Sequence, residues 1–185
     1  MARELRHISV GKFWGDEAAK VSRADKPEWA DPLPAILDFK AQLDKAGIQL
    51  LLVPVPPKAA IYPQKILPGF DVRTDDAAPL LHRFYEELRA AGIEVLDLIP
   101  LMIQKDDENA DPVFCKTDSH WSGTGCMLAA RAIAENVRRK LAAPLPRKEF
   151  VSEWKEVQIT GDLIGLLPAD AQKPGPENTH RLLPG

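Results

Sequence analysis

The sequence has little of what several large classes of protein require. No apolar run is long enough to cross a bilayer, and the longest one, Leu50–Val55, is already broken by Pro54. The first ten residues, MARELRHISV, lack the apolar core of a signal peptide. The net charge is −3, so no basic excess exists to bind nucleic acid or an anionic membrane surface. These absences favour a globular protein with another kind of partner.

The overall composition is that of one ordinary folded domain. The chain has 185 residues, of which 45% are hydrophobic and 28% charged, and this length is enough to bury a core. Seventeen prolines indicate long, stiffened connections between elements. We therefore expect a single domain over residues 1–185.

Two segments repeat the order helix, glycine, strand. A helix is predicted to begin after Asp31 and to end at about Ala46, followed by a buried strand over Ile48–Val55. A second helix is predicted over Pro79–Ala91, followed by a strand over Ile93–Ile99. This order is typical of an α/β fold with a mainly parallel sheet.

Sites in such folds form beyond the carboxyl ends of the strands, where Lys58 and Asp97 are placed. Lys58 is a candidate to hold an acyl or sugar oxygen, although a lysine after a strand is commonly plain surface. Asp97 is better explained as a cap of its loop. Farther on, Trp154–Leu167 is predicted to hold a short strand with Asp162 near the site, and residues 169–185 a loose tail.

The residues with the most chemistry lie in CKTDSHWSGTGCMLAA, from Cys115 to Ala130. Asp118 and His120 are two positions apart, so in an extended segment both face the same side and Ser119 faces away. A carboxylate beside an imidazole fixes its tautomer and stabilises its charged form, as in a general base with its orienting group. The alternative is that Asp118 only caps a turn and His120 is a surface residue.

A helix is predicted directly after this pair, with Ser122 as its N-cap and no proline before Pro144. Cys126, Ala130, Ile133 and Val137 recur at helical spacing and predict its apolar face.

Several blocks resemble the alginate O-acetyltransferase family of AlgJ/AlgX-type proteins, which belong to the SGNH-hydrolase-like group. They are DSHW with the following GCMLAA, GIQLLLVPVPPKAAIYP at residues 47–63, TGDLIGLLP at residues 160–168, and FWG at residues 13–15. The resemblance implies a three-layer α/β/α domain and acetyl transfer to hydroxyls of an exopolysaccharide such as alginate. It implies Asp118 and His120 as catalytic residues, no cofactor, a periplasmic location, and other acetylation or export proteins as partners.

One part of the family pattern is missing. In the family a nucleophilic serine follows the Asp-His block in a Gly-Asp-Ser-like turn, and none of the five serines here has such a context. The expectation is therefore a truncated member, incomplete at the C-terminus and inactive alone. The alternative is a non-catalytic polysaccharide-binding or scaffold module.

Other residues of the block allow two explanations each. Trp121 either stacks on a sugar ring or closes off the core. Cys115 and Cys126 flank the pair and are predicted to form a disulfide in an oxidising compartment, with two buried thiols as the alternative. Cys115, Asp118, His120 and Cys126 include zinc-type ligands, but C-x4-H-x5-C matches no common zinc module, so no metal is predicted.

Overall fold

The computed structural model describes residues 11–71, 74–103, 111–141 and 149–184. The contacts divide the chain into two compact units, Met1–Ile103 and Gln104–Gly185. Among the described residues, no helix has both the length and the apolar character needed to span a membrane.

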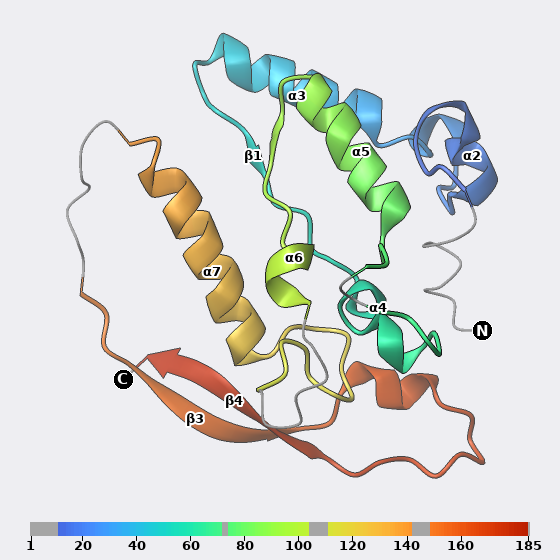
Figure 1. Cartoon of the computed structure of the whole chain (residues 1–185), viewed down its shortest axis with the longest axis vertical. Coiled ribbons are helices and arrows are strands. Elements are labelled where there is room, and N and C mark those ends of the chain that lie inside the picture. The colour runs from blue at the N-terminus through green and yellow to red at the C-terminus, as the bar shows by residue number, and fades with distance from the viewer. Residues whose placement is uncertain (1–10, 72–73, 104–110, 142–148, 185) are drawn as a thin grey trace. The chain divides into compact units, whose positions relative to one another are not determined.

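The first unit contains the predicted helix–strand repeat (Figure 1). Helices α3 (Leu33–Lys45) and α5 (Pro79–Ala90) precede strands β1 (Leu51–Leu52) and β2 (Glu94–Val95), respectively. The two strands pair in parallel, with Leu51 opposite Glu94. The shorter helices of the unit are η1 (Gly15–Glu17), α2 (Ala18–Val21), η2 (Pro27–Trp29), α4 (Lys58–Ile61), η3 (Pro63–Lys65) and α6 (Ile99–Met102).

Both long helices end at the predicted glycines, and in the same way. Gly47 and Gly92 have φ angles of +68° and +78°, a conformation that glycine adopts without a steric penalty. The N–H of Ile48 donates to the carbonyl of Leu43 at 2.9 Å, and Gly47 donates to Asp44 at 3.0 Å. Such a pair of bonds satisfies the last carbonyls of the helix and turns the chain toward the strand.

The core of this unit joins the second helix to its strand and to the N-terminal aromatic residues. It comprises Trp14, Phe84, Tyr85, Leu88, Ile93 and Val95. Trp14 is fully buried, and its ring centroid lies 5.2 Å from that of Phe84. The FWG block therefore contributes core packing.

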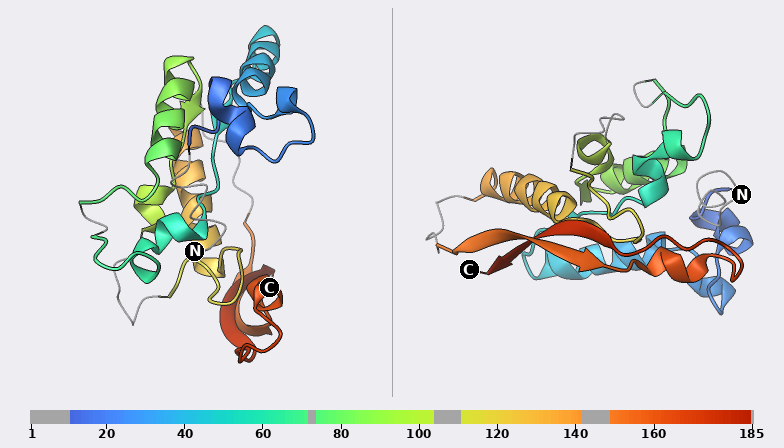
Figure 2. Two further views of the ribbon diagram at one scale, coloured as in Figure 1. Left: turned by 90° about the vertical axis from the view of Figure 1, so that its right-hand side faces the viewer. Right: turned by 90° about the horizontal axis from the view of Figure 1, so that it is seen from below.

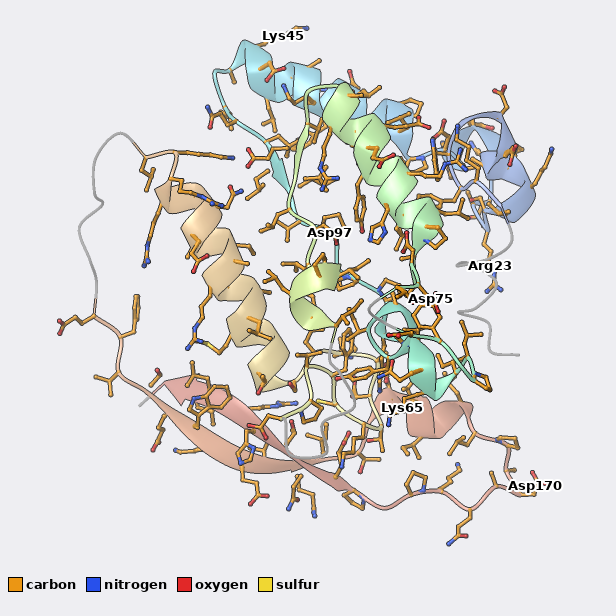
Figure 3. The ribbon with its side chains drawn as sticks, in the orientation of Figure 1. Arg23, Lys45, Lys65, Asp75, Asp97 and Asp170 are labelled. Atoms are coloured by element: carbon orange, nitrogen blue, oxygen red, sulfur yellow. The ribbon has the colours of Figure 1, made fainter. Side chains whose placement is uncertain are left out.

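Asp97 caps its loop, as predicted. Its Oδ1 accepts a 2.9 Å hydrogen bond from the N–H of Ile99 at the start of α6, at the place that Figure 3 labels. Its Oδ2 lies 3.3 Å from Nε2 of His82, whose Nδ1 contacts Asp76 at 2.8 Å. A histidine on α5 is thus held between two carboxylates.

The second unit consists of helix α7 (Gly123–Arg138), strands β3 (Ser152–Ile159) and β4 (Glu177–Pro184), and the 3-10 helix η4 (Asp162–Leu166). The strands form an antiparallel ribbon that begins at the pair Ser152–Pro184 and ends at Ile159–Glu177. Helix α7 contacts β4 with its N-terminal end and leads away from the ribbon (Figure 2). A Cβ atom on Gly123, its first residue, would lie 2.4 Å from the carbonyl oxygen of His180.

The ribbon corrects two predictions. The strand predicted within Trp154–Leu167 exists, but it begins at Ser152 and ends at Ile159. Residues 177–184, predicted as part of a loose tail, are a strand, because the whole of β3 is available to pair with them. The polar sequence of β4 gives no apolar alternation that would reveal this pairing.

The predicted apolar face of α7 is wrong by one position. Gly125 and Ala129 are its buried residues, whereas Cys126 and Ala130 are exposed. A Cβ atom on Gly125 would lie 2.2 Å from the carbonyl oxygen of Val113, so the helix and the preceding segment approach at that glycine. Close backbone contact, rather than large apolar side chains, decides which face is covered.

The parallel ladder with its preceding helices places the chain in the α/β class. Each strand of that ladder has two paired residues, and the second sheet is antiparallel. The mainly parallel sheet of a three-layer domain therefore stays a prediction.

Candidate functional site

Asp118 and His120 lie together at the start of the second unit. Oδ1 of Asp118 accepts a 2.9 Å hydrogen bond from the N–H of His120, and the same oxygen lies 2.6 Å from Nδ1 of the imidazole. The side chain of Asp118 is 19% exposed and that of His120 is 80% exposed. The two groups share a side as predicted, but a turn closed by the Asp118 carboxylate, not extended alternation, brings them together.

The backbone around this turn is closed by short antiparallel contacts. Phe114 and Trp121 form a bridge, and the N–H of Cys115 donates to the carbonyl of His120 at 3.2 Å. Ser122 then begins α7 as predicted, because its Oγ accepts from the N–H of Gly125 at 3.3 Å. The pair is therefore held in a tight loop directly before a capped helix.

Ser119 does not face His120. Its Oγ donates a 2.5 Å hydrogen bond to Oδ2 of Asp162, and its N–H donates to Oδ1 of the same carboxylate at 2.7 Å. Asp162 therefore lies at the site, as the sequence predicted, and its Oδ2 is 3.9 Å from Nδ1 of His120. The double contact with Ser119 was not predicted. It joins segments 43 residues apart, and the residue types alone do not reveal it.

The environment lowers the pKa of both carboxyls. For Asp118, partial desolvation acts upward, but the hydrogen bonds from the backbone and ring of His120 and from the N–H of Asp162 outweigh it and lower the pKa. For Asp162, the hydrogen bonds from the hydroxyl and N–H of Ser119 are the main reason that the pKa is lowered. Both groups are thus ionised at neutral pH and available as acceptors.

These shifts predict how acid affects the turn. A lowered pKa means that the folded state favours the ionised carboxylate. Its contribution to the free energy of unfolding is therefore present above the pKa of the unfolded chain, about 3.9, and is lost as the pH falls through the lower pKa of the folded state. Ser119→Ala should raise the pKa of Asp162 toward its ordinary value, because the hydroxyl donor is removed. The carboxyl ¹³C shift of Asp162 followed against pH measures this. Ser152→Ala, at an exposed position on β3, is the control and should leave that titration unchanged. An unchanged titration in Ser119→Ala would contradict the assigned cause.

Asp118, His120 and Asp162 each offer a ligand atom, and these atoms lie within 4.8 Å of one another. The set is mostly exposed and already internally hydrogen-bonded. Among the described residues, the alternative set that includes Cys115 and Cys126 does not come together as a group of ligands.

The predicted disulfide is absent from the structure, in which both cysteines are thiols. Cys115 is buried, and its Sγ lies 3.8 Å from both the carbonyl oxygen of Trp121 and Oγ1 of Thr179 on β4. Cys126 is exposed on α7. The contacts of Cys115 with β4, which the sequence did not predict, account for the position of its sulfur.

The two predicted substrate-binding residues have different settings. Trp121 follows His120 and is half-buried, with its indole nitrogen covered by protein and without a hydrogen-bond partner. Lys58 is the first residue of α4, half-buried in the first unit. Their roles in binding stay predictions.

Comparison with known proteins agrees with the blocks that the sequence carries. The family described as the SGNH hydrolase-like domain of acetyltransferase AlgX matches residues 13–182. The probable alginate O-acetylase AlgJ of Pseudomonas aeruginosa is 33% identical over 167 residues, which are 88% of this chain and 41% of that protein. This chain thus spans about two-fifths of the length of that relative.

Two solved structures have a similar fold. The O-acetyltransferase domain of Pseudomonas putida AlgJ matches with a TM-score of 0.67 and 30% identity, over 82% of this chain and 54% of that one. Pseudomonas aeruginosa AlgX matches with a TM-score of 0.65 and 20% identity, over 94% of this chain and 42% of that one. The predicted resemblance is confirmed: this chain belongs to the family of SGNH hydrolase-like domains that includes acetyltransferase AlgX.

Proposed function

We propose that this chain supplies the histidine base and the orienting aspartate of an O-acetyltransferase that acts on hydroxyls of an exopolysaccharide such as alginate. The observation that carries the proposal is the 2.6 Å contact between Nδ1 of His120 and Oδ1 of Asp118. With the proton on Nδ1, the carboxylate accepts a hydrogen bond from that N–H, and the Nε2 lone pair is left to take a proton from a nucleophile.

The chemistry requires two proton transfers through that histidine. A serine hydroxyl attacks the acetyl carbonyl of the donor while His120 removes its proton and returns it to the leaving group. A sugar hydroxyl then attacks the acetyl-serine, His120 takes its proton, and the serine leaves with that proton. Asp118 stabilises the imidazolium in both steps.

Neither of the two serines next to His120 in the sequence is proposed as the nucleophile of this reaction. Ser119 donates its hydroxyl to Asp162, and the hydroxyl of Ser122 donates to the carbonyl of Pro112 at 2.5 Å while it caps α7. Neither is available to His120. A serine block after Gly185, as in the family pattern, would complete the site and the mainly parallel sheet of a three-layer α/β/α domain over residues 1–185.

Substrate contacts follow from the same proposal. The part of Trp121 that is accessible stacks on a sugar ring next to His120, and Lys58 holds an acyl or sugar oxygen. The location is periplasmic, with other exopolysaccharide acetylation or export proteins as partners. No cofactor is required by the chemistry.

Mass spectrometry of a mannuronate oligosaccharide incubated with a chromogenic acetyl ester tests the function. We expect acetylated oligosaccharide from a longer form of the protein that carries the serine block after Gly185, and none from the 185-residue chain. Hydrolysis of the ester by the 185-residue chain, lost in Ser119→Ala, would contradict the assignment of the nucleophile.

Acetylation measured in this way, together with a titration of oligosaccharide binding, distinguishes a second function. The engagement of both serines beside His120 also suits a polysaccharide-binding or scaffold module without catalysis. That function predicts saturable binding of the oligosaccharide by the 185-residue chain and no acetylation by the longer form.

A further inference from the structure

The pair Asp118–His120 is an exposed catalytic arrangement that needs an external support. The imidazole is 80% exposed, and its Nδ1 lies 2.6 Å from Oδ1 of Asp118 and 3.9 Å from Oδ2 of Asp162. An exposed side chain with few contacts gains rotamer entropy when it leaves a single geometry. A productive base, in contrast, must stay close to one orientation. Something other than burial therefore has to fix the turn.

We propose that Asp162 is the positioning residue of this turn, holding Asp118 and His120 in register by binding Ser119 between them with both carboxylate oxygens. The proposal rests on the proposed function, because it assigns Asp162 to the support of the same base. Ser119 is the one residue that separates the two groups, so fixing its N–H at 2.7 Å and its hydroxyl at 2.5 Å fixes the backbone on either side.

The backbone of Asp162 contributes a second link, directly to Asp118. The N–H of Asp162 donates to Oδ2 of Asp118 at 3.3 Å, while Oδ1 of Asp118 accepts from His120. One oxygen of the orienting carboxylate is thus used by the histidine and the other by the segment that carries Asp162. The plane of the Asp118 carboxylate is defined by both contacts.

The segment that carries Asp162 is docked independently of its side chain. The N–H of Leu163 donates to the carbonyl of Thr117 at 3.1 Å, and the N–H of Gly161 donates to Oγ1 of Thr117 at 3.2 Å. These bonds remain when the carboxylate of Asp162 is removed. A substitution of Asp162 therefore tests the carboxylate and leaves the segment attached.

A second carboxylate binds the loop at its other end in the same way, through backbone N–H groups and a hydroxyl. Glu177 at the start of β4 accepts from the N–H of Lys116 and the N–H of Thr117, each at 2.8 Å, and from Oγ1 of Thr117 at 2.7 Å. These bonds are to the two residues that precede Asp118. Asp162 is the carboxylate that reaches the residues between the base and its orienter.

The experiment measures the tautomer of His120 in the 185-residue chain by the ¹⁵N shifts of its two ring nitrogens at alkaline pH. Wild type should hold the proton on Nδ1, facing Asp118. In Asp162→Ala the ratio of the Nδ1–H to the Nε2–H tautomer should fall by up to about fivefold, the range expected for an exposed hydrogen-bonded pair. Asp162→Asn keeps an oxygen for the N–H of Ser119 and should restore most of that ratio.

Asp170 provides the matched control. It is an exposed aspartate at the outer bend between η4 and β4, where Figure 3 labels it, and Asp170→Ala should leave the tautomer ratio at the wild-type value. An unchanged ratio in Asp162→Ala would overturn the proposal. An equal fall in Asp162→Asn and Asp162→Ala would also overturn it, because the effect would then come from charge and not from the tether.

The tautomer ratio of His120 is measured without any acetyl transfer, so it is independent of the activity of the longer form. A fall in the ratio together with an inactive longer form supports the positioning role and contradicts the proposed function. An unchanged ratio with an active longer form contradicts the positioning role alone.

Discussion

Replacing His120 by alanine is expected to abolish acetyl transfer by the longer form of the protein, with a loss of about 10³-fold or more in rate. The loss follows from the two proton transfers assigned to Nε2, neither of which has another base within the turn. Asp118 and Asp162 lie on the Nδ1 side of the ring, at 2.6 Å and 3.9 Å, and cannot replace it.

The variant Asp118→Asn removes the charge of the carboxylate and changes the tautomer of His120 while it keeps the size of the side chain. The amide keeps the size of the carboxylate but can donate to Nδ1, which favours the tautomer with the proton on Nε2. In a serine triad the equivalent change lowers kcat by about 10⁴-fold, and we expect a loss of similar order here. The loss should appear in kcat and leave the binding of oligosaccharide nearly unchanged, because the role assigned to Asp118 is to orient His120 and not to hold the sugar.

His180→Ala is the matched control, since His180 is an exposed histidine on β4 of the same unit. Rates of oligosaccharide acetylation, measured by mass spectrometry for all three variants, decide the result. Acetylation by His120→Ala at the rate of His180→Ala would show that His120 is a surface residue and that the catalytic assignment is wrong.

The sequence predicted the local parts of the fold well. Helices α3, α5 and α7 were expected from apolar spacing, from Ser122 as a cap and from glycines as stops, and all of these features depend on nearby residues. The two strands of the parallel ladder were predicted too long. Strand length depends on the partner, and only Leu51–Leu52 meets Glu94–Val95 in a parallel ladder.

In the candidate site, too, contacts between sequence neighbours could be predicted and contacts between distant residues could not. Asp118 and His120 are neighbours in sequence, so their contact could be predicted from two positions. The two carboxylates that bind the backbone around them come from far along the chain: Asp162 is 43 residues from Ser119, and Glu177 is 60 residues from Thr117. Their positions depend on the ribbon and on η4. Strand β4 was predicted as a tail, so the role of Glu177 could not be anticipated.

The contact that brings the second carboxylate to the site depends on Gly161. A Cβ atom at this position would lie 2.0 Å from the carbonyl oxygen of Thr117, 2.1 Å from its carbon and 2.5 Å from the nitrogen of Asp118. These atoms are backbone and cannot turn aside as a flexible side chain would. The φ of −73° at Gly161 suits any residue, so close approach and not conformation requires the glycine.

Gly161→Ala is accordingly expected to destabilise the second unit by about 3 kcal/mol, the upper part of the range for overpacking at a tight contact. The segment must move away from Thr117, which breaks the bond from Leu163 and draws Asp162 away from Ser119. Urea unfolding followed by the NMR signals of residues 113–123 measures the change for this unit alone.

Gly165→Ala is the matched control within the same 3-10 helix, η4. No atom lies within 4 Å of a Cβ atom built on Gly165, and alanine loses less backbone entropy than glycine, so this variant should be neutral or slightly more stable. The hydrogen exchange of the N–H of Leu163 gives a second measurement, because that bond should open in Gly161→Ala and persist in Gly165→Ala. Equal stability and equal exchange in the two variants would mean that the segment carrying Asp162 does not dock on Thr117, and the support assigned to the catalytic turn would be lost with it.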